Sequence, residues 1–138
     1  MIRLKIMTPD DGVMIDEDIV YMDVLTTDGH IGLQKDITPM VAKLKPGPTT
    51  ITRADKTKRT GILLDALLYV DRTIGIKVMA SKFIWEDEVN LEETKQRIIE
   101  IEKQMQKLQP NDKKLIFLED EMITAKSIVE ALSNYTKK

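Results

Sequence analysis

Residues 28–47, DGHIGLQKDITPMVAKLKPG, hold the turns around which the rest of the chain is organised. Gly29 and Gly32 lie three positions apart, and each marks a place where the backbone needs a positive φ or a close approach by another group. Pro39 forces extended backbone on the threonine before it, and a Lys-Pro-Gly-Pro cluster ends the apolar run that follows. Because the stretch holds no nucleophile–base pair and no set of metal ligands, it predicts a shaped surface rather than a catalytic centre.

The composition limits the class of protein. A length of 138 residues allows one domain, or a small domain with an appendage. The formal net charge of −2 provides no basic field, so we expect no nucleic-acid partner. The chain has no cysteine, which excludes disulfides and thiolate sites and fits a reducing compartment. No apolar run approaches the roughly 20 residues that span a bilayer, so we expect no direct membrane insertion.

Residues 1–85 carry the period-two pattern of strands broken by turns. In one such run, Val20, Met22 and Val24 are expected to share one face of a strand. No helix-length pattern interrupts these short runs, and their close spacing is typical of an all-β sandwich or barrel. We therefore predict an N-terminal β-sandwich of short antiparallel strands over residues 1–85.

A different pattern begins at residue 86. From about 87 to 109 the apolar residues recur every seven positions as a narrow seam, and a Pro-Asn-Asp turn follows. A second helix, expected over about 112–135, carries matching series of apolar residues. Two seams joined by a short turn predict a C-terminal antiparallel hairpin of two helices over residues 86–138. The sevenfold series are Leu91, Ile98 and Met105; Thr94, Ile101 and Leu108; Leu115, Met122 and Val129; and Leu118, Ala125 and Leu132.

The second helix also carries apolar residues off its seam, namely Ile116, Phe117, Ile123 and Ile128. Two helices alone cannot cover these side chains, so a third surface is required. Either the chain's own sandwich covers them or a partner protein does, and the two arrangements can alternate. We therefore predict Phe117 and Ile123 as protein-interface residues.

The residues capable of acid–base or metal chemistry form no convergent set. The acidic clusters at 16–18 and 119–121 lack the spacing of a calcium loop, and we expect them to be solvated surface. His30 is the only histidine, and we expect it in an exposed loop. The Gly-x-x-Gly spacing is not a phosphate loop, because no Lys-Ser/Thr pair ends it. We predict no catalytic residue, no metal ligand and no cofactor, and the chain is not expected to be an enzyme.

The small β domain, the helical hairpin and residues 28–47 together resemble the epsilon subunit of rotary F-type ATP synthases. The family pattern is roughly GELGILPGHAPLVTALKPG, and this chain shares its glycines, Pro39 and the Leu-Lys-Pro-Gly at 44–47. Length and element order also agree, so the resemblance spans nearly the whole chain. It implies a non-catalytic central-stalk subunit that binds the gamma subunit and couples it to the membrane ring, with a hairpin that can regulate ATP hydrolysis.

The resemblance also implies which residues meet which partner. Those implied to face the membrane ring of carrier subunits are Gly29, His30, Ile31 and Gly32. Those implied to lie toward gamma are Ile37, Thr38, Pro39 and Met40. His30 stands where the family usually has an acidic residue, and Ile37 replaces a histidine. The hairpin can reach the catalytic subunits, and such a subunit is cytoplasmic and peripheral, held at the inner face of the cell membrane through its complex.

The chain departs from the family at a nucleotide-binding motif. Some bacterial members bind ATP through a motif of the form Ile/Leu-Asp-x-x-Arg-Ala at the start of the first helix. Here Asn90 replaces the carboxylate, Glu93 replaces the arginine and Thr94 replaces the alanine. A glutamate at that position repels phosphate, so we expect no useful ATP affinity. Asp65-Ala66 also stands where the family usually has Gly-Gly.

The charge of the second helix bears on inhibition. In the family, basic residues of this helix meet an acidic loop of the catalytic subunits. Residues 112–135 hold five acidic residues against three lysines, so like charges would meet and charge-based inhibition is expected to be weak. These departures are those of a divergent bacterial member, and they leave open a specialised F-type-like motor. The alternative function is a free-standing protein-interaction or chaperone-like adaptor that uses the helical hairpin.

Overall fold

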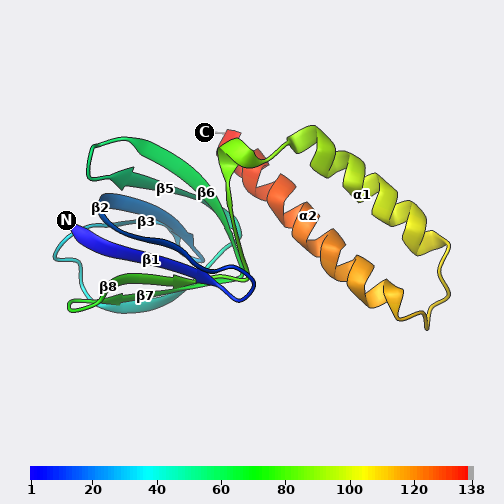
Figure 1. Ribbon diagram of the computed structural model, residues 1–138, viewed down its shortest axis with the longest axis horizontal. Helices are drawn as coiled ribbons and strands as arrows, with labels where there is room; N and C mark the ends of the chain where they lie inside the picture. The colour runs from blue at the N-terminus through cyan, green and yellow to red at the C-terminus, as the bar shows by residue number, and fades with distance from the viewer. Residues whose placement is uncertain (137–138) are drawn as a thin grey trace.

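The computed structural model describes residues 1–136, with side chains described through residue 132. Its strands form one β domain, and two helices lie side by side at one end of that domain (Figure 1). The strands are β1 (Ile2–Thr8), β2 (Gly12–Thr26), β3 (Gly29–Leu33), β4 (Met40–Leu44), β5 (Gly47–Arg53), β6 (Lys58–Leu64), β7 (Ala66–Asp71), β8 (Gly75–Met79) and β9 (Lys82–Trp85). The helical elements are a 3₁₀ turn, η1 (Glu86–Glu88), and the helices α1 (Leu91–Gln106) and α2 (Lys114–Thr136).

The strands pair in the order β1-β8-β7-β4-β2-β5-β6-β9, and β3 pairs with β2. The long strand β2 joins the two halves of the sandwich, because it pairs with β1 along residues 12–19 and with β3 and β5 further on. This architecture confirms the predicted β-sandwich followed by a helical hairpin. The pairing of β1 with β8 is parallel, whereas the other pairings between the described strands are antiparallel.

An irregularity in β2 changes which residues face inward. The pairing of β2 with β5 shifts register between Ile19 and Tyr21. Ile19 and Met22 are both fully buried, while Val20 between them is 39% exposed. The expectation that Val20 shares a face with Met22 and Val24 is therefore wrong, because a bulge inserts one extra residue and reverses the alternation.

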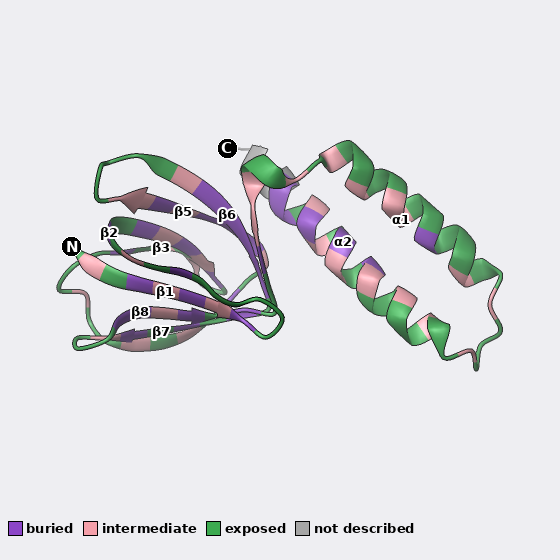
Figure 2. Cartoon of the chain, viewed as in Figure 1, coloured by how far each residue is buried: buried purple, intermediate pink, exposed green. Residues whose placement is uncertain are grey.

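The core lies between the two layers of the sandwich, where the inward-facing residues of several strands meet (Figure 2). Leu4, Ile6, Leu68, Ile76 and Val78 are each fully buried there. Burial of aliphatic side chains contributes about 25 cal/mol per Å² of apolar area, so this core is the main source of stability for the β domain.

The hairpin is held together by the seam that its sevenfold spacing predicts. Ile101 of α1 is fully buried, and Met122 and Ala125 of α2 are 8% and 7% exposed. The first helix is shorter than the expected 87–109, because Asn90 caps its N-terminus by accepting a hydrogen bond from the Glu93 amide at 3.1 Å. The residues before that cap form η1 instead.

Candidate functional site

The residues expected to face a partner at the start of β3 lie on a strand edge. Among the described strands, β3 pairs with β2 alone, so its other edge keeps free backbone donors and acceptors. Gly29 has φ +112°, and its carbonyl accepts a hydrogen bond from Thr26 Oγ1 at 2.8 Å. His30 is exposed, as expected, but it lies on β3 and not in a loop, because it pairs with Leu25 of β2. Its Nδ1 lies 3.2 Å from Asp23 Oδ1 on β2. Ile31 is half-buried and packs against the core.

Gly32 lacks a side chain so that another group, the Tyr21 ring, can lie close to its backbone. Its backbone φ is not in the left-handed region, but a Cβ placed there would lie 2.0 Å from the Tyr21 hydroxyl oxygen. The Tyr21 ring therefore rests on the bare backbone of Gly32. The two glycines thus divide between them the two roles predicted from the sequence.

The run after β3 is divided between core and surface. Ile37 and Met40 are half-buried and pack against the core, whereas Thr38 and Pro39 are exposed. The residues implied to face the ring begin at Gly29, at the start of β3, whereas those implied to face gamma begin at Ile37, beyond the end of β3. The structure therefore does not bring the two sets of residues together. Ile37 instead lines a polar cavity of about 470 Å³ with the N-terminus and the β7–β8 turn.

A larger surface was missed at the level of sequence. On the outer side of β4, β7, β8 and β1, the strand registers place eight side chains in two rows of four, which we call the outer grid. One row is Val41, Tyr69, Lys77 and Lys5, and the other is Lys43, Leu67, Met79 and Met7. The alternation within residues 66–70 shows which side chains point outward, but it does not show that these four strands are adjacent.

The outer grid is apolar at its centre. Val41 is 69% exposed, Leu67 48% and Met79 49%, and with Tyr69 they line a groove of about 350 Å³. Lys77 also lines this groove. Lone exposed apolar residues are normal on a protein surface, but a contiguous apolar groove is typical of a protein–protein contact.

The joint between sandwich and hairpin is fixed by Arg59 on β6. Its guanidinium donates two hydrogen bonds of 2.9 Å to the Asp87 carboxylate and lies 4.0 Å from the centroid of the Trp85 ring. The hydrogen bonds from Arg59 lower the pKa of Asp87. Phe83 packs edge-on against Trp85 with 4.9 Å between ring centroids. These contacts hold η1, the turn that leads into the helices, against the sandwich.

Only the C-terminal part of α2 packs on the sandwich. Ile128 and Leu132 form a second apolar cluster with Ile62 and Leu64 of β6, and all four are buried. Nearer the hairpin tip, the side chains of α2 on the outer face are uncovered (Figure 2). The exposed fractions are 70% for Ile116, 76% for Phe117 and 64% for Ile123. Of the two predicted ways to cover these apolar residues, the chain's own sandwich covers Ile128. The other three remain exposed and can be covered by a partner protein.

A cavity of about 310 Å³ lies beside this joint, between β9, η1 and the two helices. The three altered positions of the family's ATP motif, Asn90, Glu93 and Thr94, line it. The polar groups of two of them are occupied within the helix, since Asn90 caps the Glu93 amide and the Thr94 hydroxyl donates to the Asn90 carbonyl at 2.9 Å.

An ion pair within the hairpin borders the same cavity. Arg97 of α1 donates from Nε and Nη2 to the two carboxylate oxygens of Glu121 on α2, at 2.6 and 3.0 Å. We call this pair the interhelical clasp. The hydrogen bond from Arg97 lowers the pKa of Glu121, and Glu100 adds a weaker contact to Arg97 at 3.3 Å. Glu121 was expected to be solvated surface, but it is a half-exposed partner that joins the two helices.

The cavity does not fit a nucleotide. Its walls carry the carboxylates of Glu88, Glu93 and Glu121 against the single guanidinium of Arg97, which Glu121 already neutralises. A triphosphate placed there would meet unbalanced negative charge, which costs free energy.

The described residues offer no group of three or more metal-ligating side chains. No helix in the described part of the chain is both long and apolar enough to cross a membrane.

Adding ATP to the isolated chain is expected to produce no binding heat at micromolar concentrations, with or without Mg²⁺. The reason is the excess of carboxylates around the cavity at the joint. Isothermal titration calorimetry measures this directly, and a dissociation constant in the micromolar range would contradict it. The Glu93→Arg variant provides the matched comparison, because it restores the positive charge of the motif at one position.

Removing the clasp with Glu121→Gln is expected to speed amide exchange in α1 and α2 at neutral pH, with little change in the β domain. Because the folded-state pKa of Glu121 lies below its ordinary value of 4.5, the clasp is fully formed above that value. Its contribution is lost as the pH falls through the lowered pKa. Hydrogen–deuterium exchange over a series from pH 7 downward measures this, and the two proteins should converge once the pH falls below the lowered pKa of Glu121. Equal exchange of Glu121→Gln and the exposed control Glu130→Gln at pH 7 would rule out the clasp.

The chain is similar in sequence to known proteins of one kind. The family described as ATP synthase, Delta/Epsilon chain, beta-sandwich domain matches residues 1–86. The ATP synthase epsilon chain of Mycoplasma genitalium is 31% identical over 105 residues, covering 76% of this chain and 77% of that protein. The epsilon chain of Mycoplasma pneumoniae is 32% identical over 104 residues, covering 75% and 77%.

The fold is also shared with solved structures. A chain in the cryo-EM structure of the Euglena gracilis mitochondrial ATP synthase, OSCP/F1/c-ring in rotational state 1, gives a TM-score of 0.70 at 18% identity. That match covers 98% of this chain and 81% of the other. The fold, the family match over residues 1–86 and the epsilon-chain relatives agree, and this chain belongs to the ATP synthase delta/epsilon family.

Proposed function

We propose that this epsilon-type chain is a non-catalytic subunit of the central stalk of an F-type ATP synthase, where it binds gamma and couples it to the membrane ring. The observation that carries this proposal is the exposed outer grid on a chain of this family. A stalk subunit has to transmit torque between neighbours, and that requires broad protein contacts rather than a reaction centre. The complex then holds the chain at the inner face of the cell membrane.

The outer grid is the surface best suited to gamma. Its apolar centre, formed by Val41, Leu67, Tyr69 and Met79, provides the buried core that a stable interface needs. Lys5 and Lys43 lie at the ends of the two rows and Lys77 lines the groove beside Tyr69, so the grid favours acidic side chains on the partner. Val41 directly follows the predicted gamma-facing run that ends at Met40. The proposed gamma contact therefore moves from that run onto the face beyond it, with Thr38 and Pro39 at its margin.

The free edge of β3 is the proposed contact with the membrane ring. His30 is exposed there, and Asp23 beside it provides a carboxylate at the same surface. Gly29 leaves open space where a side chain would stand, so its backbone can approach a neighbour, whereas the Tyr21 ring already covers Gly32.

The exposed apolar residues of α2 favour the second candidate function, an adaptor that binds other proteins through the hairpin. Ile116 and Phe117 lie near the tip, away from the sandwich, where a client could reach them. Purification of the tagged chain from its own cells separates the two functions. Recovery with gamma and the catalytic ATPase subunits supports the stalk, and recovery alone or with unrelated clients supports the adaptor.

Substituting Val41→Asp in the outer grid is expected to weaken gamma binding about 100-fold, because a carboxylate would be buried at the apolar centre of the contact. The exposed Ile99→Asp, on α1 away from the grid, is the matched control and should bind as the unaltered chain does. Surface plasmon resonance with immobilised gamma measures both. Equal affinities for the two variants would refute the assignment of gamma to this face.

Deleting residues 87–138 is expected to change the ATPase rate of the assembled complex less than twofold. The acidic residues of α2 oppose contact with an acidic loop, so the hairpin contributes little charge-based inhibition. The measurement compares steady-state ATP hydrolysis by complexes assembled with the complete and shortened chains. A many-fold rise on deletion would contradict the expectation. The charge-altered Asp120→Lys chain tests the reason, since it should inhibit more strongly.

A further inference from the structure

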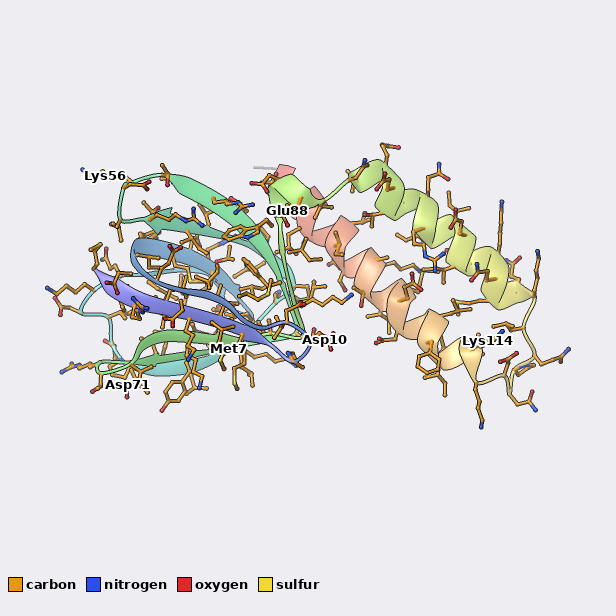
Figure 3. The ribbon with its side chains drawn as sticks, in the orientation of Figure 1. Met7, Asp10, Lys56, Asp71, Glu88 and Lys114 are labelled. Carbon is orange, nitrogen blue, oxygen red and sulfur yellow. The ribbon has the colours of Figure 1, made fainter. Side chains whose placement is uncertain are left out.

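Three surface grooves join end to end, from the outer grid onto helix α2. The groove of about 350 Å³ on the grid meets a second one of about 490 Å³ at Met79, which lines both. The second meets a third groove of about 270 Å³ at Pro9 and Ser81, and the third reaches Ile123 of α2. Figure 3 labels Met7 on the sandwich and Asp10 at the end of the sandwich that faces α2. We call this continuous surface the band.

The band is mainly apolar on the sandwich and becomes more polar at the hairpin end, and its charge changes from one end to the other. Met7 and Met79 lie in its middle, and Ile123 lies at the hairpin end. Lys5 and Lys77 border the grid end. The residues with carboxylates at the hairpin end are Asp10, Asp65 and Asp120, with Lys82 as the cation among them.

We propose that the band binds a single elongated element of its partner, an amphipathic helix that contacts the sandwich and the docked α2 at once. The apolar stripe of that helix covers Tyr69, Met79 and Ile123. Its side chains are acidic at the grid end and basic at the hairpin end, to complement the charges of the band. This inference rests on the proposed function, in which the partner is gamma.

The continuity of the grooves favours one partner over two. Ile123 and Ile128 lie about 140° apart around α2, so they belong to different faces of the helix. Ile128 faces the sandwich and is 9% exposed, whereas Ile123 lines the third groove and is 64% exposed. A helix about 10 Å wide that lies along the band would cover Ile123 on this second face.

The geometry gives the band a consequence for the hairpin. Ile123 and Asp120 belong to the band only while α2 is docked on the sandwich. A partner that touches them binds the docked state more tightly than any other state, and by linkage it stabilises docking by the same factor. The partner thus keeps α2 docked on the sandwich, with no nucleotide needed in the cavity at the joint.

The test measures the affinity of purified gamma for the full-length chain and three variants by surface plasmon resonance. Ile123→Asp and Asp120→Lys alter the hairpin end of the band, and each is expected to weaken binding about tenfold. Ile99→Asp alters an apolar residue on α1 that is 46% exposed and outside the band, and it should leave binding unchanged. Gamma should also slow amide exchange in α2 of the unaltered chain, and should do so less in Ile123→Asp. Circular dichroism verifies that the variants are folded.

The outcomes separate this inference from the proposed function. If Val41→Asp abolishes binding while Ile123→Asp and Asp120→Lys bind like Ile99→Asp, gamma covers the grid alone and the band is refuted. If Val41→Asp has no effect, the proposed gamma contact itself fails. If sedimentation shows the unaltered chain as a dimer that Ile123→Asp dissociates, with gamma affinity unchanged, the occupant is a second copy and the inference is wrong.

Discussion

The packing of the last turns of α2 on β6 is the contact on which the arrangement of the molecule depends. Ile128, Ala131 and Leu132 meet Ile62 and Leu64 there, and this cluster is separate from the core of the sandwich. Ile84 of β9 and the hairpin residues Val89 and Leu91 pack against the same cluster, so it joins the beginning of α1 and the end of α2 to the sandwich. A partner that covers α2 as well as the sandwich would stabilise this docked arrangement.

Two polar contacts stabilise different parts of that joint. Arg59 ties η1 to the sandwich through Asp87 and the Trp85 ring, and none of these contacts involves α2. The clasp between Arg97 and Glu121 joins α1 to α2, and Lys82 of β9 is a further positive charge acting on Glu121. Undocking of the hairpin as a unit would therefore require loss of the apolar cluster and of the other contacts of α2 with β5 and β9.

Much of this fold could be predicted from local patterns, and the exceptions have physical causes. The period-two runs and the sevenfold seams depend on neighbours in sequence, and they indicated the sandwich and the hairpin; the family comparisons confirm the resemblance to epsilon subunits. The bulge at Val20 arises where β2 pairs with strands on both sides, which no single run of residues reveals. The outer grid depends on the parallel pairing of β1 with β8, which are some seventy positions apart in the sequence. Asp65 adopts φ +49° where the family usually has glycine, and its sequence alone does not show that strain.

The residues that line the cavity at the joint determine whether a nucleotide could hold the helices against the sandwich. A nucleotide bound between the helices and the sandwich would contribute charge and contacts that hold the hairpin closed. Here Asn90 and Thr94 use their polar groups to begin α1, and Glu121 takes the guanidinium of Arg97. The contacts between the helices are thus made by the chain's own side chains, and we expect no nucleotide to contribute to them. We therefore expect the position of the hairpin to depend on the partner that covers the exposed side of α2, because apolar side chains remain in contact with water there when α2 is docked.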